Sequence, residues 1–435
     1  MKFAIYTLGC KVNQYETQAM EAELKKRGHQ LVDFDEDAQV YIINTCTVTA
    51  VSDKKSRSAI RQAKKRGAVV AVCGCYAQTD PAAVRALGVD LLSGTGDHMA
   101  FLDRAEELAG IRQAEAADLV DDVMGRRTFE YLPAGGLSQR TRAMLKVEDG
   151  CVNFCSYCII PYARGPVRSM PLETVKAEAA RLAAEGYREM VVTGIEISSW
   201  GRDLPGKPEL ADLILGVAQA APGVRIRLGS LEPRTITEDF CRRTAGVEEL
   251  CPHFHLSLQS GCDATLKRMN RKYDTARYRE SVRLLREHFD DPGITTDLIV
   301  GFPGESDGEF AQTVAFIREM GFSAMHVFPY SRRSGTPAAK MEGQVLNAVK
   351  EERAKQVRET AEEMKRTYLE RQLGKDVRVL FEEERDGLWR GHTPEYMEVA
   401  AHSAEDLHNQ VRRVTLSGWS EEGLTGVLLD EKNVD

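Results

Sequence analysis

Three cysteines stand close together near the middle of the chain, in the run Cys151-Val-Asn-Phe-Cys155-Ser-Tyr-Cys158. Thiolates at such short intervals can hold an iron–sulfur cluster, and three protein ligands leave one iron of a four-iron cubane free to bind another molecule. A zinc site uses the same donors, but it normally needs a fourth Cys or His, and none follows closely. We therefore predict a catalytic cluster on Cys151, Cys155 and Cys158.

A second group of cysteines is dispersed along the chain, but each member follows a predicted buried strand by a residue or two. The group comprises Cys10, Cys46 and Cys75, after strands predicted over residues 3–9, 40–44 and 68–73. Because parallel strands end at one edge of a sheet, these thiols are expected to converge and to hold a second cluster with an open iron. The alternative is a set of buried structural cysteines. Cys73, inside its strand, is expected to pack in the core.

The elements that position the second group form a repeating strand and helix pattern over about the first hundred residues. Short runs of branched residues alternate with helical stretches, which predicts a doubly wound parallel sheet. The first helix is expected to begin with Asn13 as its cap, and Glu16 is expected to close a capping box.

A second series of strands follows a stretch of acidic and glycine-containing sequence. The predicted strands cover residues 143–147, 189–194, 224–229, 253–258, 294–300 and 324–328. Six units with amphipathic helices between them predict an incomplete (β/α)6 barrel. A charged helix over 344–373 then leads to alternating sequence typical of a small β domain. The fold class is therefore α/β, with expected divisions at residues 1–112, 113–138 (a linker), 139–367 and 370–435.

Polar residues and glycines gather at the carboxyl ends of the predicted barrel strands, where the loops of a parallel barrel collect functional groups. Glycine at such a position lets the backbone approach a ligand closely, although each segment alone is compatible with an ordinary turn. We predict that this edge binds a cofactor through Thr193, Gly194, Glu196, Ser230, Glu232 and Gln259.

The formal net charge of −8 gives no general attraction for nucleic acid, so any contact with RNA must come from local patches. Basic residues after the fourth and sixth barrel strands are candidate phosphate contacts, namely Lys267, Arg268, Arg271, Lys272, Arg332 and Arg333. No segment approaches membrane-spanning length, and the amino terminus lacks the hydrophobic run of a secretory signal. Ten cysteines are then expected to be reduced thiols in the cytoplasm, with no membrane partner.

The first cysteine motif, with aromatic Tyr157 before its last cysteine, resembles the radical S-adenosylmethionine superfamily. The resemblance implies that S-adenosylmethionine chelates the open iron and that Tyr157 borders this cofactor. It also implies an electron donor, such as a flavodoxin or ferredoxin, because the cofactor is cleaved by an electron from the cluster.

The segments around the second group, Thr7-Leu8-Gly9-Cys10-Lys11-Val12-Asn13-Gln14, Asn44-Thr45-Cys46-Thr47-Val48 and Gly74-Cys75-Tyr76-Ala77-Gln78, are similar to those of the methylthiotransferase family. The resemblance covers essentially the whole chain. It implies two 4Fe–4S clusters, one in each of the first two domains, and a terminal TRAM domain that contacts RNA. In that family a methylthio group replaces the hydrogen on a substrate carbon.

The residues after the first cysteine, Lys11-Val12-Asn13, resemble the branch that acts on N6-threonylcarbamoyladenosine beside the tRNA anticodon. The anticodon stem-loop of tRNA is then the expected partner. Two alternatives share the chemistry: methylthiolation of isopentenyladenosine in tRNA, and methylthiolation of an aspartate in a ribosomal protein. A third alternative is a non-catalytic iron–sulfur protein that carries electrons or binds RNA. Glu196 departs from the family pattern, in which a histidine-containing segment is expected there.

Overall fold

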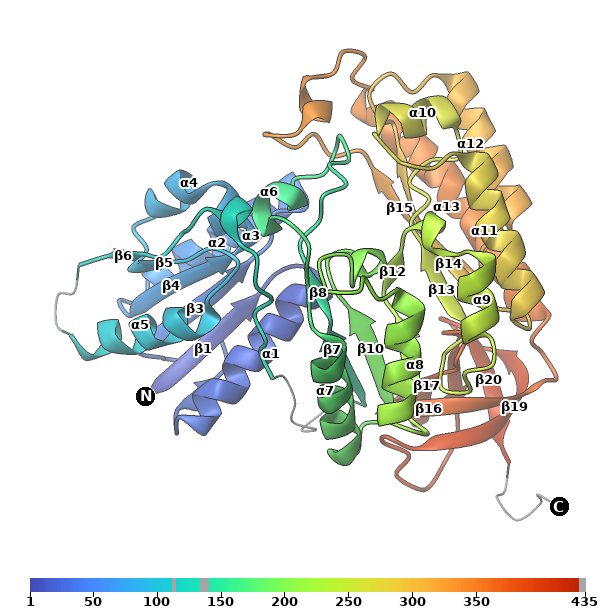
Figure 1. Ribbon diagram of the computed structural model, residues 1–435, viewed down its shortest axis with the longest axis horizontal. Helices are drawn as coiled ribbons and strands as arrows, with labels where there is room; N and C mark the ends of the chain where they lie inside the picture. The colour runs from blue at the N-terminus through green and yellow to red at the C-terminus, as the bar shows by residue number, and fades with distance from the viewer. Residues whose placement is uncertain (112–114, 134–140, 430–435) are drawn as a thin grey trace.

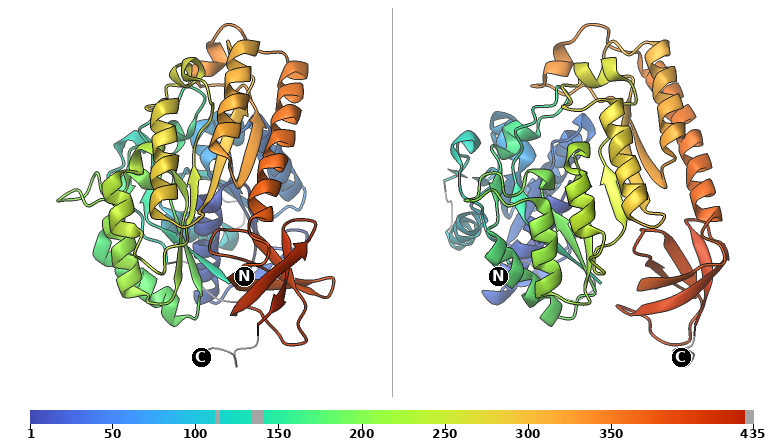
Figure 2. Two further views of the ribbon diagram at one scale, coloured as in Figure 1. Left: turned by 90° about the vertical axis from the view of Figure 1, so that its right-hand side faces the viewer. Right: turned by 45° about the vertical axis from the view of Figure 1, so that its right-hand side comes forward.

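The computed structural model describes residues 1–111, 115–133 and 141–429, which fold into three regions in chain order (Figure 1). An amino-terminal sheet with its helices lies beside a central set of parallel strands, and a small β-barrel lies at the end of the last long helix (Figure 2). This arrangement confirms the predicted α/β class and all three of its parts. No helix among the described residues is long and apolar enough to cross a membrane.

The amino-terminal sheet has six parallel strands in the order β2-β1-β3-β4-β5-β6. The order reverses beside β1, as in a doubly wound fold. The strands are β1 (Lys2–Thr7), β2 (Gln30–Val32), β3 (Val40–Thr45), β4 (Val69–Gly74), β5 (Leu91–Leu92) and β6 (Ala117–Asp118). The helices are α1 (Lys11–Lys26), α2 (Ala50–Lys64), α3 (Cys75–Thr79), α4 (Pro81–Arg85) and α5 (His98–Gly110).

Buried side chains cover both faces of this sheet, because successive residues of β3 and β4 point to opposite sides. Tyr41 and Ile43 pack with α2 on one face, and Val40 and Ile42 pack with α1 and α5 on the other. Strand β6 adds an edge to the sheet from within the stretch predicted as a linker. Residues 113–114 and 134–138 of that stretch lie outside the described residues.

The central region consists of two adjoining parallel sheets, β11-β10-β7 and β12-β13-β14-β15, and the chain passes between them at Gly229. Its strands are β7 (Arg142–Lys146), β10 (Glu189–Thr193), β11 (Arg225–Leu228), β12 (Ser230–Leu231), β13 (His253–Leu256), β14 (Gly293–Val300) and β15 (Ala324–Pro329). A short pair, β8 (Glu148–Asp149) and β9 (Arg168–Ser169), lies beside the first sheet. Six of these strands agree with the six predicted units, and the short strand β12, directly after Gly229, is an addition to them.

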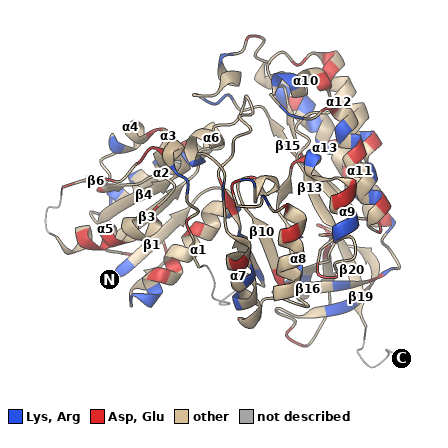
Figure 3. Cartoon of the chain, in the orientation of Figure 1, with Lys and Arg blue, Asp and Glu red and all other residues tan. Residues whose placement is uncertain are grey.

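Helices pack against the outer side of these sheets and share one large core with them. They are α7 (Leu172–Ala184), α8 (Leu210–Ala220), α9 (Glu238–Thr244), α10 (Asp263–Arg268), α11 (Thr275–His288), α12 (Asp307–Met320) and α13 (Asn347–Glu370). The short helix α6 (Ile160–Arg164) instead contacts α3 of the amino-terminal region. Single 3-10 turns cover Val123–Gly125, Ile197–Ser199, Pro233–Thr235 and Pro337–Lys340. Basic and acidic residues are interspersed along the outer helices (Figure 3), so these helices present no continuous surface of one charge.

The terminal region is a closed five-stranded barrel in the order β16-β17-β18-β20-β19. Its strands are β16 (Asp376–Arg385), β17 (Leu388–His392), β18 (Glu398–Ala401), β19 (Val411–Trp419) and β20 (Leu424–Leu428). Alternate residues of β16 point inward, and Val379 and Phe381 are fully buried in its core. Closure leaves no long unpaired edge, which a thin β domain otherwise exposes to other chains.

Candidate active site

The closely spaced cysteines lie in the loop between β8 and α6, beyond the carboxyl end of β7. Cys155 is buried, and Cys151 and Cys158 are half-buried. The loop folds back on itself, because the Cys158 N–H donates to the Cys155 carbonyl at 2.9 Å and Phe154 adopts a left-handed φ of 46°. The three thiols therefore share one short, tightly turned segment at the mouth of the central sheets.

The surroundings of these thiols oppose their ionisation. Burial raises the pKa of Cys158 to about 12 and raises the pKa of Cys151 still further, and the neighbouring Cys155 adds to both effects. Thiolates so placed need a positive centre to neutralise them. The donor set thus fits an iron–sulfur cluster, whose irons supply that charge.

Arg271 lies beside this loop. Its Nη1 donates to the Cys155 sulfur at 3.3 Å, and its Nε donates to the Tyr273 hydroxyl at 3.1 Å. Hydrogen bonds to cluster sulfurs are one of the means by which a protein sets the potential of an iron–sulfur centre. Arg271, predicted as a phosphate contact, is thus bonded to a thiol of the site.

The dispersed cysteines meet at the carboxyl edge of the amino-terminal sheet, as the strand pattern predicts. Cys10 precedes the first residue of α1, Cys46 follows β3, and Cys75 opens α3 directly after β4. A Cβ on Gly9 would lie 3.2 Å from the Cys46 sulfur, so the Cys10 and Cys46 segments touch. Burial raises the pKa of Cys75 to about 12, and Cys10 is near enough to contribute.

Cys73 belongs to a different environment. It lies within β4 and packs in the hydrophobic core together with Phe101 and Leu102. Burial raises its pKa above the range of an ordinary thiol. The side chain therefore lies in the core, as expected from its position one step before the strand ends.

Within the described part of the chain, no three His, Cys, Asp or Glu side chains converge to hold a single metal ion. A cubane makes a different demand, because each thiolate binds a different iron and the sulfurs need not meet at one point. Two groups of three thiols, each at a strand-end edge, match that demand in donor type and number.

A buried ionic network joins the two groups, and Arg164 is its centre. This residue follows the close cysteine motif on α6 and is fully buried. Its Nε donates to the Cys75 sulfur at 3.3 Å, and its Nη2 donates to the Asn13 Oδ1 at 2.8 Å. Its other hydrogen bonds go to Glu16 and Asp149. The central region thus reaches a thiol of the amino-terminal region directly.

Lys146 completes this network from β7. Its ammonium donates to Glu16 Oε1 at 3.0 Å and to Asp149 Oδ2 at 2.8 Å. Although burial alone would raise it, the charges of Arg164 and Lys146 lower the pKa of Glu16 to about 2. Both carboxylates are therefore ionised and compensated, as buried charges must be.

The predicted capping roles of Asn13 and Glu16 are wrong. Helix α1 starts at Lys11 with Cys10 as its N-cap, and no side chain caps it. The Asn13 amide instead donates to the Leu8 and Thr45 carbonyls at 2.8 and 3.0 Å, which ties the two cysteine loops together. The stronger partners across the interface, above all Arg164, outweigh the local capping interaction.

The predicted cofactor residues lie at the carboxyl edge of the central sheets. Thr193 ends β10 and is buried, and a Cβ on Gly194 would lie 2.8 Å from Glu148 Oε2. The Glu196 N–H donates to that carboxylate at 2.7 Å, and the Glu196 carboxylate accepts from the Ser198 N–H at 3.1 Å. Burial raises the pKa of Glu148 well above its usual range. Sequence reasoning did not single out this carboxyl, although it directly precedes the cysteine motif.

The remaining predicted cofactor residues continue this edge. Ser230 opens β12 and is exposed, and Glu232 accepts from Arg234 Nε at 2.9 and 3.0 Å. Gln259 has a left-handed φ of 65° and donates its N–H to the Asp297 carbonyl at 2.9 Å. Tyr157 meets Phe302 edge to face at 6.4 Å. The predicted residues thus follow the ends of successive central strands, as the close cysteines follow β7.

The candidate phosphate contacts divide into two groups. Arg268 pairs with Glu309 at 2.7 Å, and Arg333 is buried in an ion pair with Asp53 of the amino-terminal region. Like Arg271, these two arginines bond to other residues of the protein. The side chains that remain exposed are those of Lys267, Lys272 and Arg332.

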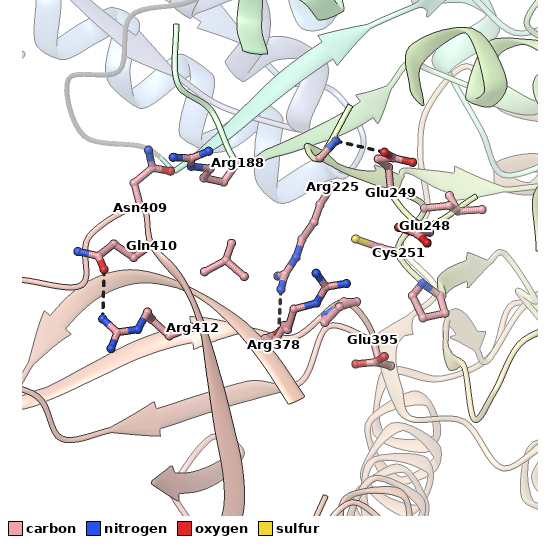
Figure 4. A pocket seen from close by; sticks show the side chains of 15 residues that line it. Arg188, Arg225, Glu248, Glu249, Cys251, Arg378, Glu395, Asn409, Gln410 and Arg412 are labelled. Atoms are coloured by element: carbon pink, nitrogen blue, oxygen red, sulfur yellow. Dashed lines mark hydrogen bonds between the residues drawn. The ribbon is translucent and has the colours of Figure 1, made fainter. Parts of the chain in front are cut away.

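Two hollows lie where the terminal barrel meets the central sheets. The first, here called the arginine groove, has a volume of about 740 Å³ and is lined by Arg188, Arg225, Arg378 and Arg412 together with acidic residues (Figure 4). Arg225 donates to the Arg378 carbonyl at 2.8 Å across it.

The second, here called the barrel cavity, has a volume of about 500 Å³ and opens inside the curve of the central strands. Its walls come from all three regions of the chain: Lys11 from the amino-terminal region, Arg227, His253 and His255 from the central strands, and Tyr396 from the terminal barrel. Tyr396 stacks between His253 and His392, with ring centroids 4.9 and 4.7 Å away. The residue after Cys10 thus lines a cavity to which all three regions contribute.

Comparisons with known proteins agree with this geometry. A model of the Radical SAM superfamily matches residues 145–317, and one described as Uncharacterized protein family UPF0004 matches residues 2–94. A structure of the radical S-adenosylmethionine methyltransferase TsrM from Kitasatospora setae aligns with a TM-score of 0.57, 18% identity, and coverage of 78% of this chain and 76% of that chain. It shares the fold.

Curated relatives align over nearly the whole chain. The threonylcarbamoyladenosine tRNA methylthiotransferase MtaB of Bacillus subtilis is 39% identical, over 95% of this chain and 93% of its own. The protein of the same name from Thermotoga maritima is 36% identical, over 98% and 96%. A tRNA-2-methylthio-N(6)-dimethylallyladenosine synthase of Pelotomaculum thermopropionicum is 32% identical, over 98% and 97%.

Proposed function

Because the chain belongs to the radical S-adenosylmethionine methylthiotransferase family, we propose that it methylthiolates N6-threonylcarbamoyladenosine beside the anticodon of tRNA. Like the family, it is a radical S-adenosylmethionine methylthiotransferase. Full-length identity of 35–39% to relatives named for this nucleoside supports the substrate, as does Lys11-Val12-Asn13 after the first cysteine. The product would be the 2-methylthio derivative of that nucleoside.

Two 4Fe–4S clusters would serve this reaction, one on Cys151, Cys155 and Cys158 and the other on Cys10, Cys46 and Cys75. When bound, these clusters and S-adenosylmethionine would supply the radical that removes the hydrogen from adenine C2 and the methylthio group that takes its place. The observation that carries the proposal is the position of Arg164. This residue bonds to Cys75 and to Asp149, and so connects the two cysteine groups. One substrate can therefore be presented to both groups.

The chain's own residues would orient the cofactor and exclude water. Thr193, Gly194, Glu196, Ser230, Glu232, Gln259 and Tyr157 would contact S-adenosylmethionine at the strand ends. Arg271 would hold the Cys155 thiolate, and Glu148 would fix the Gly194 to Glu196 turn through its bond to the Glu196 N–H. Burial of this edge would protect a reactive radical from stray hydrogen donors.

Residues 1–112, 139–367 and 370–435 would act as the cluster domain, the radical domain and a TRAM domain, with 113–138 as their linker. The anticodon stem-loop would approach where the three meet, with Lys267, Lys272 and Arg332 as exposed phosphate contacts. Reduction would come from a protein such as a flavodoxin or ferredoxin. Because its substrate would be tRNA and its thiols are free, the enzyme would work in the cytoplasm.

Nucleoside analysis of tRNA from a deletion strain tests the substrate. Loss of 2-methylthio-N6-threonylcarbamoyladenosine is expected, and unchanged levels would contradict the assignment. Loss of a methylthiolated isopentenyladenosine, or of methylthio-aspartate in a ribosomal protein, would favour one of the two alternatives. Incubation of the reduced, reconstituted protein with S-adenosylmethionine should give 5′-deoxyadenosine, whereas a pure electron carrier should give none.

Iron and sulfide content tests the two cluster sites. Replacing Cys10, Cys46 and Cys75 together with alanine should remove roughly half of the iron, as expected for two cubanes each held by three thiolates. The matched variant of Cys151, Cys155 and Cys158 should remove the other half and abolish 5′-deoxyadenosine. A Cys73→Ala variant should keep its full iron content, because that thiol packs in the core.

A further inference from the structure

One of the cations that line the barrel cavity has no bonding partner in the described protein. Three Lys or Arg residues line the cavity, and two of them are paired. Arg227 makes a two-pronged bond to Glu189 at 2.6 and 2.9 Å, and Lys365 donates to the Glu422 carbonyl at 3.1 Å. The ammonium of Lys11 has no hydrogen-bond or ion-pair partner among the residues that the structure describes.

The nearest charged neighbours of Lys11 are held elsewhere. Arg142, whose guanidinium lies 5.4 Å from the Tyr396 ring centroid, pairs with Glu382 at 2.7 Å. Its Nη1 also donates to the Tyr396 hydroxyl at 3.2 Å. Each arginine in this part of the cavity is therefore matched by a glutamate. Four carboxylates also line the cavity, of which Asp297 lies 3.4 Å from His255 and Glu398 pairs with Arg390 at 2.8 Å. Lys11 is the cation of the cavity that has no partner in the described chain, and an unpaired ammonium favours an anionic ligand.

Hydrogen-bonding groups line the same wall. His253 and His255 both meet the Thr295 hydroxyl at 3.0 Å, and the Nδ1 of His253 is buried with no partner in the described chain. A buried polar atom without a partner is rare in a protein, and a ligand can satisfy it. The cavity therefore offers an unpaired cation and adjacent hydrogen-bonding groups.

The position of Lys11 relates the cavity to the reaction. Lys11 directly follows Cys10 and opens α1, so a group bound to its ammonium is held beside the dispersed cysteines. In adenine, C2 and the carbon bearing N6 are both bonded to N1 and lie on the same edge of the ring. A substituent on N6 therefore extends from the edge that must face the sulfur donor.

We propose that the barrel cavity receives the threonylcarbamoyl group of the substrate and that Lys11 binds its carboxylate. This inference rests on the proposed function and extends it, by naming the residue that selects the nucleoside. The ureido and hydroxyl groups of the substituent would meet the polar wall around His253 and Thr295. An uncharged isopentenyl group would instead cover the exposed Lys11 ammonium without supplying a counter-ion, which disfavours that substrate.

A binding experiment with two stem-loops tests the assignment. One anticodon stem-loop contains N6-threonylcarbamoyladenosine, and the other contains the same nucleoside with its carboxylate converted to the uncharged amide. The reconstituted wild-type enzyme should bind the acid more tightly than the amide by roughly tenfold to a hundredfold, the range expected for a hydrogen bond to a charged group. Lys11→Gln should bind both equally.

Three controls accompany Lys11→Gln. Lys11→Arg keeps the charge and should keep most of the preference for the acid. Lys25→Gln removes an exposed lysine from the other end of the same helix and should leave the preference unchanged. Iron content and 5′-deoxyadenosine formation show that each variant has folded and holds its clusters.

The possible outcomes separate the two proposals. If the wild-type enzyme prefers the acid and methylthiolates it, but Lys11→Gln retains the full preference, the role of Lys11 is wrong while the proposed function stands. If the wild-type enzyme does not distinguish acid from amide, the carboxylate is not recognised at all. If it does not methylthiolate the acid stem-loop, the proposed substrate is wrong as well.

Discussion

At the scale of single residues, the cysteines could be found from the sequence but their buried partners could not. Spacing and strand position identified both groups, because each thiol follows a local pattern. Arg164 gives no local sign of its role, since its partners Glu16 and Asn13 are about 150 positions away. Reading Asn13 and Glu16 as a helix cap placed them correctly near a helix start but missed the partner that determines their orientation.

Arg164→Met should be strongly destabilising. The change leaves Glu16 and Asp149 buried with Lys146 as the main remaining cation, and breaking a buried ion pair costs about 3–5 kcal/mol. Chemical unfolding should show a lower midpoint, and the iron bound by the dispersed cysteines should decrease. Arg283→Met, which removes an exposed arginine from helical pairs on α11, should have little effect on either measurement. Equal stability of the two variants would contradict the network's importance.

Glu16 should make stability depend on pH in the acidic range. Its pKa in the folded protein is about 2, below its ordinary value of 4.5, so its contribution is fully present above the ordinary value. That contribution is lost as the pH falls from about 4.5 toward 2, because the unfolded chain then binds a proton that the folded protein does not. Unfolding free energies of wild type and Glu16→Gln should therefore differ at neutral pH and converge in acid. Parallel curves would show that Glu16 does not titrate as described.

At the scale of elements, the sequence located the strands because branched, apolar runs are long enough to be recognised. The short strands β5 and β6 were missed, since two residues carry no periodic pattern and are defined only by pairing with a neighbour. A glycine stands at the end of β4 and another directly after β8. Gly74 (φ +95°) and Gly150 (φ +94°) each precede a predicted cluster cysteine and adopt a conformation that other residues avoid.

Alanine at these two glycines should remove one cluster each. A Cβ on Gly74 would lie 2.5 Å from the Thr45 carbonyl oxygen, and a Cβ on Gly150 would lie 2.1 Å from the Pro166 carbonyl oxygen, so the backbone must move. Gly74→Ala should lose about half of the iron but still form 5′-deoxyadenosine, whereas Gly150→Ala should lose both that product and the other half of the iron. Gly88→Ala, with φ +71° and open space around its Cβ, should keep its iron. A full iron content in either cysteine-loop variant would contradict the assignment of that loop.

At the scale of the whole molecule, the barrel cavity was not predictable, because no local pattern fixes how three separately patterned regions pack together. The contacts that fix the terminal barrel are specific, however. Arg225 donates to the His392 carbonyl at 3.0 Å, and Arg227 donates to the Pro394 carbonyl at 2.7 Å. These bonds hold the segment that carries Tyr396, so the terminal barrel forms one wall of the proposed substrate cavity.

Tyr396→Ala should loosen this docking without unfolding either part. The ring lies between two imidazoles and faces the guanidinium of Arg227 at 4.7 Å, and each such contact contributes about 0.5–2 kcal/mol. Its loss should increase amide hydrogen exchange in residues 393–397 by roughly tenfold or more, while exchange in β14 stays slow. Trp419→Ala removes an exposed aromatic ring of the same barrel that faces Arg366 of α13 and not the Tyr396 stack, and should leave exchange in 393–397 unchanged. Slow exchange in Tyr396→Ala would mean that the arginine bonds alone hold the barrel, and the cavity wall would then not depend on the stack.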